Sequence, residues 1–506
     1  MNADTWTVQP GYGLGFMSTT TDTNGEYIVD KAIALGAALQ DVVTTIEQEK
    51  DRFPTIDIHF SHSDPLTAPI LVSLPENGLR LRSDGADQRL RLIEVTDFKR
   101  ISLTYKGAEL VRSQDATTGS QAPAFKRVYQ LFGASYPGEY MPPQNGGGSG
   151  TYVLSWPGIA FNFPLQNSAW SPEKDHVSLL GSSAAASAAH MAIFEGKTWA
   201  DTRKDLFVRE PTGPRSTAIA LRPRDGLPAE LEYATVHADG RVEIARRHPS
   251  QPFVLVPGQT TPQDLVTELG APDAKFKPID KEPSVEKALP TSHKRTSSST
   301  RRTSNGRMQP MSQPSSYSST NTDTFDADFD NSSDHSDDPA ERRARDTYWC
   351  YFSHGLDILV GPPSSPTSAF EDLVVKRVVI QGNVPGSAAF NRHRRLRWVL
   401  NLSSQDLTSE SNFELEIKPV LLELFPEAAK DPQTAQGRVI NRCWDDPMES
   451  TYFLPDQDRD AEEGGKGSEA WLGNVRLFQF FRENGSGLMF EVLQNGCVAG
   501  VFVVGE

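Results

Sequence analysis

The chain has 506 residues, a formal net charge of −16 and only three cysteines, Cys350, Cys443 and Cys497. Its length allows two or three domains, and its acidity argues against a protein that coats nucleic acid or anionic lipid with its whole surface. The cysteines form no CxxC pair, and no apolar window reaches the ~18 residues of a spanning helix. We therefore expect a soluble, intracellular protein without a disulfide framework, metal site, cofactor or membrane span.

Residues 1–112 are predicted to form a first unit of one helix and several short strands. Apolar residues recur at helical spacing between Gly36 and Pro54, namely at Leu39, Val42, Val43 and Ile46. Alternating apolar residues then predict strands at 56–60, 70–74, 79–81, 89–95 and 101–105. Short strands in direct succession favour an antiparallel meander with one face in water.

The second unit, residues 113–260, opens with a helix from Pro123 to Phe132. Proline suits the first helical turn, and Gly133 fits the position just after a helix. A hairpin is predicted over 152–163, and further strands at 218–221, 233–236 and 242–244. The run 182–189, rich in serine and alanine, is either a surface helix or a loop.

The third unit, residues 261–282 and 346–417, repeats this plan. Thr261 is a predicted helix cap, and the helix ends at Gly270 with a buried stripe of Leu265, Val266 and Leu269. Strands are predicted at 348–352, 356–359, 373–380, 398–402 and 413–417. Because helix, glycine stop and hairpin recur in one order, we predict an internal repeat.

Residues 283–345 interrupt this third unit with a composition of serine, threonine, aspartate, arginine and proline. Such a segment cannot bury enough apolar surface to offset the entropy lost on ordering, so we expect a disordered insert. The fourth unit, residues 418–506, is predicted to hold a short helix between 426 and 440. Its strands are predicted at 475–481, 488–493 and 497–504.

Each predicted hairpin contains a polar turn that ends in glycine, and an alternating apolar strand follows at once. Glycine adopts the positive φ that a tight turn needs, so four glycines are predicted turn positions: Gly78, Gly158, Gly355 and Gly487. Together these patterns predict an α+β protein of four related helix-plus-antiparallel-β-hairpin units. The units are expected to form two lobes, with the long disordered insert between a helix and its own hairpin.

The strongest local positive charge comes from four arginines within six residues, Arg392, Arg394, Arg395 and Arg397. Guanidinium groups pair well with phosphate oxygens, so this arginine run is a candidate contact for lipid phosphate. The alternative, which we favour, is a charged strand edge that discourages aggregation.

No catalytic motif accompanies the arginine run. The sequence has no nucleophile elbow, P-loop, HExxH or strand-borne GxGxxG pattern. His59 and His62 would point to opposite faces of a strand, which does not suit a shared metal ion. We therefore predict no catalytic residues and no metal ligands.

Several stretches, in one order along the chain, resemble the eukaryotic phagosome assembly factor family. They are NGLRL at 77–81, QRLRLIEV at 88–95, FGASYPGEY at 132–140, GLDIL at 355–359, NVPG at 383–386 and MFEVLQN at 489–495. The long insert and the acidic loops depart from the family pattern and suggest a fungal-type member. The resemblance carries over no catalytic residue, because its shared positions here are turn glycines and strand cores.

The resemblance implies a cytoplasmic, non-enzymatic protein that joins the phagophore assembly site during autophagy. It further implies action in complex with a WD40 β-propeller partner that contacts phosphoinositides. On narrower grounds, the family name is also linked to Golgi-to-plasma-membrane transport. Two rival functions stay open at this stage, a direct phosphoinositide-binding module and a hydrolase with a scattered active site.

Overall fold

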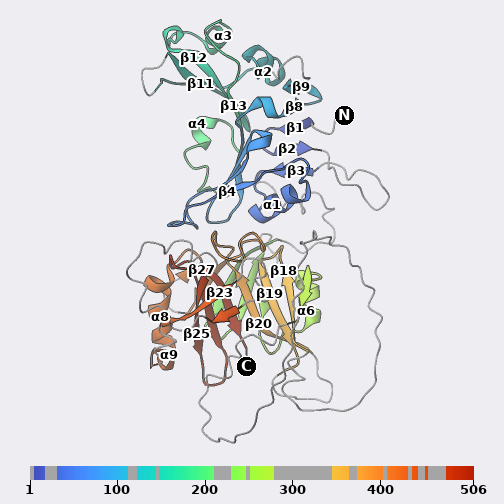
Figure 1. Cartoon of the computed structure of the whole chain (residues 1–506), viewed down its shortest axis with the longest axis vertical. Helices are drawn as coiled ribbons and strands as arrows, with labels where there is room; N and C mark the ends of the chain where they lie inside the picture. Colours follow the sequence, from blue (N-terminus) through green and yellow to red (C-terminus); the bar gives the residue numbers. More distant parts are fainter. Residues whose placement is uncertain are drawn as a thin grey trace, which may run out of the picture.

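Two β-sheet lobes follow one another along the chain in the computed structural model (Figure 1). The structure describes residues 5–16, 31–111, 122–143, 148–209, 230–246, 251–277, 345–363, 373–402, 407–430, 436–442, 451–453 and 474–505. The N-terminal lobe is built from residues 5–209 and the C-terminal lobe from residues 230–505. The predicted insert at 283–345, apart from Arg345, and the predicted strand at 218–221 lie outside the described residues.

In the N-terminal lobe, two sheets enclose one core. The five-stranded sheet has the order β3 (Lys31–Ala34), β2 (Gly13–Phe16), β1 (Thr5–Gln9), β8 (Ser102–Tyr105) and β9 (Ala108–Val111). The eight-stranded sheet has the order β10 (Glu139–Met141), β11 (Ser149–Trp156), β12 (Ile159–Gln166), β13 (His190–Phe194), β7 (Leu90–Val95), β6 (Leu79–Ser83), β5 (Ile70–Leu74) and β4 (Asp57–His59). Its helices are α1 (Leu39–Gln48), α2 (Phe125–Phe132), α3 (His176–Leu180) and α4 (Trp199–Thr202), with short turns η1 (Pro75–Asn77), η2 (Phe98–Arg100) and η3 (Asn167–Ala169).

The C-terminal lobe repeats this arrangement. Its five-stranded sheet has the order β16 (Phe253–Leu255), β15 (Val242–Arg246), β14 (Leu231–His237), β21 (Arg397–Asn401) and β22 (Leu407–Thr408). Its nine-stranded sheet has the order β17 (Ala274–Phe276), β18 (Thr347–Tyr351), β19 (Leu356–Gly361), β20 (Val374–Gln381), β27 (Val498–Val504), β26 (Gly487–Val492), β25 (Asn474–Phe481), β23 (Arg438–Arg442) and β24 (Thr451–Phe453). Its helices are α6 (Pro262–Leu269), η5 (Phe413–Ile417), α8 (Lys418–Leu424) and α9 (Pro426–Lys430).

Each lobe contains two copies of one unit. A unit runs from strands of the smaller sheet, through a helix, into a meander of the larger sheet. The last strands of the two meanders then pair antiparallel at the centre of the larger sheet, with Ile93 opposite Ile193 in one lobe and Ile380 opposite Val501 in the other. The first strands of the two units pair in parallel in the smaller sheet, β1 with β8 and β14 with β21. This arrangement confirms the prediction of four related units in two lobes.

The units begin earlier in the chain than the sequence suggested. Strands β8 and β9 open the second unit, β14 to β16 open the third, and β21 and β22 open the fourth. The proposed boundaries at 113, 261 and 418 therefore fall after these strands. Residues 231–255, assigned to the second unit, belong instead to the C-terminal lobe, because β14 pairs with β21. Parallel pairing between distant strands leaves no mark in local alternation.

Helix predictions are confirmed where the apolar spacing is strong. Helix α1 buries the four predicted residues Leu39, Val42, Val43 and Ile46. Helix α6 begins with a capping box, in which the Thr261 hydroxyl accepts from the Asp264 backbone N–H and Asp264 accepts from the Thr261 backbone. Val266, assigned to the buried stripe of this helix, is exposed. The run 182–189 forms turns and an isolated bridge, so it is a loop.

One predicted strand, at 413–417, is wrong, since these residues form the helical turn η5 that leads into α8. Alternating apolar residues at 413, 415 and 417 suggested a strand, but the same sequence places Phe413 and Ile417 one helical turn apart. Both of these are fully buried, whereas Leu415 is 78% exposed. Asn412 caps the turn by accepting a hydrogen bond from the backbone N–H of Leu415.

Three of the four predicted turn glycines have the positive φ that was expected, Gly78 at 61°, Gly158 at 79° and Gly355 at 73°. The fourth is wrong: Gly487 is the first residue of β26 and pairs with Phe481. The left-handed residue of that hairpin is Gly485, with a φ of 84°. Its backbone N–H donates to the carbonyl of Arg482, and this bond closes the turn two residues before the predicted position.

The insert joins two strands that pair with each other. Phe276 of β17 lies opposite Tyr348 of β18, so the chain leaves and re-enters the sheet at neighbouring positions. We expect replacement of residues 283–344 by a short Gly-Ser linker to retain the fold, with unchanged or slightly higher stability, because shortening a loop this much lowers its closure cost by only about 1–2 kcal/mol. Thermal unfolding checks this expectation. A melting temperature several degrees below that of the full chain would mean that the insert packs on the lobes.

Candidate functional site: the junction between the lobes

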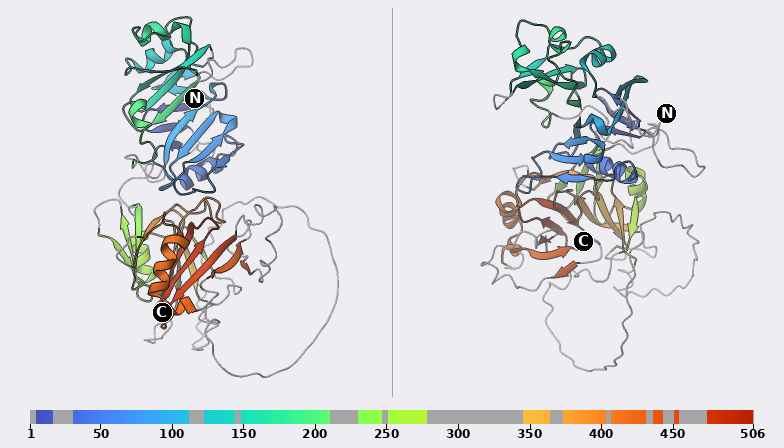
Figure 2. Two further views of the ribbon diagram at one scale, coloured as in Figure 1. Left: turned by 90° about the vertical axis from the view of Figure 1, so that its left-hand side faces the viewer. Right: turned by 45° about the horizontal axis from the view of Figure 1, so that its top comes forward.

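The predicted arginine run lies where the two lobes meet. Figures 1 and 2 show α1 and the β4 end of the N-terminal lobe facing the C-terminal lobe. The chain between β20 and β21 contributes to the facing surface of the C-terminal lobe; it includes Arg392, Arg394 and Arg395, and Arg397 is the first residue of β21. Phe60 and Phe390 contact edge to face across this junction, with ring centroids 5.9 Å apart. Asn495 adds a hydrogen bond to the carbonyl of His62 at 3.0 Å.

Arg394 joins the lobes through two carboxylates. Its Nη2 lies 2.7 Å from Oδ2 of Asp41 in helix α1, and its Nη1 lies 3.0 Å from Oε1 of Glu230. Arg89 of the N-terminal lobe reaches the same Glu230 oxygen at 2.7 Å. Both arginines and Glu230 are buried, so each charge is compensated inside the junction. A buried network of this kind fixes one relative position of the lobes, because every alternative leaves a charge unpaired.

Arg395 and Arg397 form a second group around Glu410. Arg395 is fully buried and donates from Nε to the carbonyl of Ala86 at 2.6 Å, and from Nη2 to Oε1 of Glu410 at 3.1 Å. Arg397, whose side chain is 40% exposed, contacts Glu410 at 3.1 Å and Asp87 of the N-terminal lobe at 3.3 Å. Burial lowers the pKa of Arg395, although Glu410 opposes that shift.

Two amide side chains close the centre of the junction. Gln88 donates from Nε2 to the carbonyl of Asn383 at 2.7 Å, and Asn383 donates from Nδ2 to Oε1 of Gln88 at the same distance. Both residues are buried, and both have positive φ, 53° for Gln88 and 45° for Asn383. A non-glycine residue holds this conformation only when its surroundings compensate the strain, as these reciprocal bonds do.

His393, which lies between Arg392 and Arg394 in the sequence, belongs to a buried polar group within the C-terminal lobe. Its Nε2 lies 2.9 Å from Oδ1 of Asp357, whose other oxygen accepts from Gln381 at 2.8 Å. Burial raises the pKa of Asp357, but the hydrogen bonds and charge of His393 outweigh burial and leave that pKa below its ordinary value. Burial also raises the pKa of the neighbouring Cys350 thiol, so this cysteine is an unreactive core residue.

The direct contact with lipid phosphate does not fit this placement. Arg394 and Arg395 are buried with protein partners, and Arg392 lies against the rings of Phe276 and Phe352 at 5.7 and 5.5 Å. Arg392 and Arg397 are half-buried, and two carboxylates already neutralise Arg397. The run is also not a free strand edge, because Arg392, Arg394 and Arg395 precede β21, and β21, which begins at Arg397, pairs with both β14 and β22. Arg394, Arg395 and Arg397 each contact the N-terminal lobe, so these three arginines connect the lobes.

The sequence did not identify the acidic partners of the arginines. Asp41 and Glu230 are 353 and 164 residues from Arg394, and no local pattern connects them. The amide pair did leave a signal, since Gln88 and Asn383 each begin a stretch that resembles the family, at 88–95 and 383–386. Nothing in the sequence indicated that the two stretches touch.

Acid is expected to weaken the group around Glu410. Burial raises the pKa of this carboxyl, but the charges of Arg395 and Arg397 outweigh burial and hold the pKa at about 2, against an ordinary value of 4.5. Because the folded-state pKa is the lower one, this stabilisation is complete above about pH 4.5 and disappears as the pH falls toward 2. Urea unfolding across that range should show a shallower pH dependence for Glu410→Gln than for the wild type. Glu414→Gln, at an exposed site, serves as the control, and an unchanged slope in Glu410→Gln would contradict the assignment.

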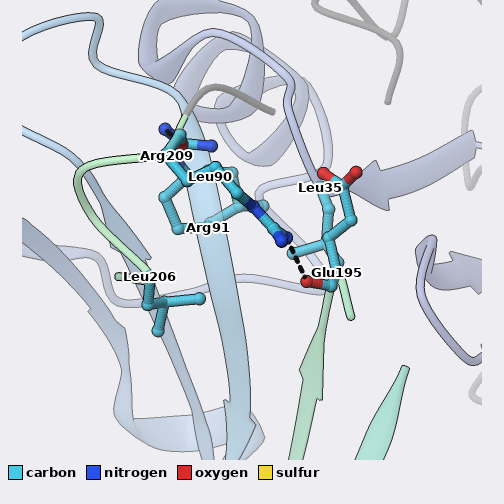
Figure 3. A pocket seen from close by; sticks show the side chains of 6 residues that line it. All are labelled: Leu35, Leu90, Arg91, Glu195, Leu206 and Arg209. Carbon is cyan, nitrogen blue, oxygen red and sulfur yellow. Dashed lines mark hydrogen bonds between the residues drawn. The ribbon is translucent and has the colours of Figure 1, made fainter. Parts of the chain in front are cut away.

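A small hollow in the N-terminal lobe is lined by Leu35, Leu90, Arg91, Glu195, Leu206 and Arg209 (Figure 3). Its polar groups already bind one another. Arg91 Nε lies 2.7 Å from Asp84, its Nη2 donates to the carbonyl of Arg209, and Arg209 donates to the carbonyl of Glu195 at 2.9 Å. These contacts close the hollow around an ion pair and leave it no evident role in binding.

Ser135 and His176 are the nearest approach to a hydrolytic pair, with Oγ 3.2 Å from Nε2 and both side chains half-buried. A serine nucleophile needs a base that a third group orients. The neighbouring carboxylate, Asp175, instead accepts a 2.6 Å hydrogen bond from the backbone N–H of Ser178 as the cap of α3. The geometry therefore gives the hydrolase hypothesis no support.

The described residues contain neither a metal-ligand cluster nor a membrane-spanning helix. Within those ranges, no three His, Cys, Asp or Glu side chains gather closely enough to hold a metal ion. None of the helices that the structure describes has the length and apolarity needed to cross a membrane.

Comparison with known proteins gave one family. A family model described as phagosome assembly factor 1 matches residues 30–299 and 322–504. A PHAF1 protein of Arabidopsis thaliana is 24% identical over 499 residues, which cover 95% of this chain and 94% of the relative. PHAF1 proteins of Caenorhabditis elegans and Drosophila melanogaster are 31% and 26% identical over 130 and 133 residues, about 26% of this chain and 28% of each relative. No solved structure matches the chain.

Proposed function

The chain belongs to the phagosome assembly factor 1 family, and from that premise we propose that it is a non-enzymatic adaptor in autophagy. In this proposal a WD40 β-propeller partner recruits it to the phagophore assembly site. The observation that carries the proposal is the extent of the family match, which takes in both lobes and every junction residue described above. The proposal therefore concerns the whole two-lobed body and not one module of it. A role in Golgi-to-plasma-membrane transport would use the same body, but no feature of the structure favours it.

The placement of the arginines supports recruitment by a partner over direct lipid binding. An acidic chain with a net charge of −16 is repelled by an anionic leaflet within about a Debye length, roughly 8 Å at physiological salt. Three of the four arginines in its densest cationic run are paired with carboxylates at the junction, so the run offers little attraction to offset that repulsion.

Liposome flotation tests this proposal with the purified full chain. Vesicles with and without phosphoinositide are mixed with the chain alone, and then with the propeller protein recovered by affinity purification from starved cells. We expect the chain to float only when the propeller protein is present. Arg397→Ala and Arg392→Ala, which change the two least buried arginines of the run, should behave like the wild type, as should the control Arg100→Ala in the N-terminal lobe.

Two results would contradict the proposal. Phosphoinositide-dependent flotation of the chain alone, lost in Arg397→Ala or Arg392→Ala but not in Arg100→Ala, would make the chain itself the lipid-binding component. Failure to recover any WD40 propeller from starved cells with the full chain as bait would remove the partner from the model.

A further inference from the structure

A groove lies on the outer face of the eight-stranded sheet, over β11. It lies between the loop that follows α2 and helix α4, and it encloses about 530 Å³ of empty space open to solvent. Its floor is Val153 and Ser155 of β11, and its two walls carry Tyr136 and Trp199.

One floor residue holds both walls. The backbone N–H of Tyr136 donates to the carbonyl of Ser155 at 3.3 Å, and the backbone N–H of Trp199 donates to the Ser155 hydroxyl at 3.2 Å. Trp199 also packs against the buried ring of Phe194, with centroids 5.3 Å apart. The walls are therefore fixed to one strand, and their separation is preorganised for an occupant.

The exposed surface of the groove is aromatic. Tyr136 is 39% exposed although it is large and apolar over most of its surface, and Pro137 beside it is also exposed. Trp199 is half-buried, and among the described residues its indole N–H has no hydrogen-bond acceptor. Two aromatic side chains and an indole donor that line one groove suit proline rings and the backbone carbonyls between them, as in the recognition of polyproline II segments.

The rim carries two carboxylates, each beside a cation. Glu139 and Asp201 line the groove, and hydrogen bonds from Thr198 and Lys204 lower the pKa of Asp201, so its carboxylate is ionised at neutral pH. Each carboxylate has a local cation, Arg203 at 3.2 Å from Glu139 and Lys204 at 3.2 Å from Asp201. These pairs are exposed and weak, so a cation on a ligand can replace either of them at little cost.

From the fixed aromatic walls, the unpaired indole donor and the two rim carboxylates, we infer that this groove binds an extended, proline-rich peptide of a partner protein that carries a basic side chain beside its prolines. The prolines would lie between Tyr136 and Trp199, and the basic group would pair with Glu139 or Asp201. A proline-rich segment is already extended when free, so it loses little conformational entropy on binding. The inference does not depend on the proposed role in autophagy.

Fluorescence anisotropy tests it with the full chain and a fluorescein-labelled peptide of alternating proline and leucine that ends in two arginines. We expect saturable binding that Tyr136→Ala and Trp199→Ala each weaken about tenfold or more, as for aromatic anchors of an interface. The matched controls are Tyr129→Ala and Trp170→Ala, whose side chains are 36% and 38% exposed in the same lobe but lie outside the groove. Glu139→Gln should weaken binding at low salt and lose its effect at high salt. Thermal unfolding of each variant confirms that it is folded.

Three outcomes would overturn the inference. Binding that falls equally in the groove and control variants would place the peptide elsewhere. Equal affinity for a glycine-serine peptide with the same two arginines would reduce the effect to charge alone. A change of oligomeric mass in sedimentation, caused by Tyr136→Ala without any effect on peptide binding, would assign the groove to a second copy of this chain.

Discussion

Replacing Arg394 by alanine is expected to lower the free energy of unfolding by about 3–5 kcal/mol, since it removes the central cation of a largely buried ion-pair network. Asp41 loses its charged partner from the other lobe, and Glu230 retains only Arg89. The free energy is measured by urea unfolding of the full chain. Small-angle scattering below the melting temperature should show a larger radius of gyration, because the lobes lose the contact that orients them.

Arg397→Ala is the matched control, three residues along the same run. Its guanidinium is 40% exposed and also bridges the lobes, through Asp87, yet exposed pairs contribute at most about 1 kcal/mol. A double variant, Arg394→Ala with Asp41→Asn, should lose less than the sum of the single changes, because removal of one partner reduces the cost of removing the other. Equal losses in Arg394→Ala and Arg397→Ala would mean that burial of the junction does not set its strength.

The second large effect is expected at Gly355, where valine should destabilise the fold by about 3 kcal/mol or more. At a φ of 73°, a β-branched residue is strained by about 1–3 kcal/mol. A Cβ atom at this position would also lie 2.4 Å from the carbonyl oxygen of Arg394, so the turn would have to move away from the arginine run. Overpacking of this kind typically lowers the free energy of unfolding by a further amount of about 1–3 kcal/mol. Urea unfolding measures the sum.

Two other glycines separate the strain from the clash. Gly485 has a φ of 84° but nothing within 4 Å of an added Cβ, so Gly485→Val should show the strain alone. Gly487 has no positive φ, but its added Cβ would lie 2.2 Å from the carbonyl oxygen of Phe480, so Gly487→Val should show the clash alone. Each is expected to be milder than Gly355→Val. Gly147, a control that the sequence would suggest, lies outside the described residues. A Gly485→Val loss equal to that of Gly355→Val would show that the close approach to Arg394 is unimportant.

The sequence predicted the fold well where the structure of a segment depends only on its own residues. The stripe of α1, the capping box of α6 and the left-handed turns at Gly78, Gly158 and Gly355 all depend on residues within a few positions of each other. The errors came from local ambiguity. Gly485 and Gly487 both suit a turn, and the sequence at 413–417 satisfies the periods of both a strand and a helical turn.

The candidate site could not be predicted, because its chemistry is made by contacts between distant segments. An arginine run with no carboxylate nearby in sequence appears free for a ligand, yet Asp41 meets Arg394 across 353 positions. The unit boundaries failed for the same reason, since β14 shows its membership of the C-terminal lobe only by pairing with β21. Alternation identifies a strand, but it does not identify the neighbour of that strand.

The polar chemistry of the junction has a consequence for synthesis on the ribosome. Every strand of the N-terminal lobe lies before residue 195, so this lobe can fold while the rest of the chain is still being made. Domains generally fold in this order, and at 5–20 residues per second the remaining ~300 residues take about 15–60 s. During that time Asp41, Gln88 and Arg89 face water, which hydrates them well. An apolar junction of the same extent would expose an apolar patch on the nascent lobe and promote aggregation. These polar side chains instead stay hydrated until the C-terminal lobe has been synthesised and can pair with them.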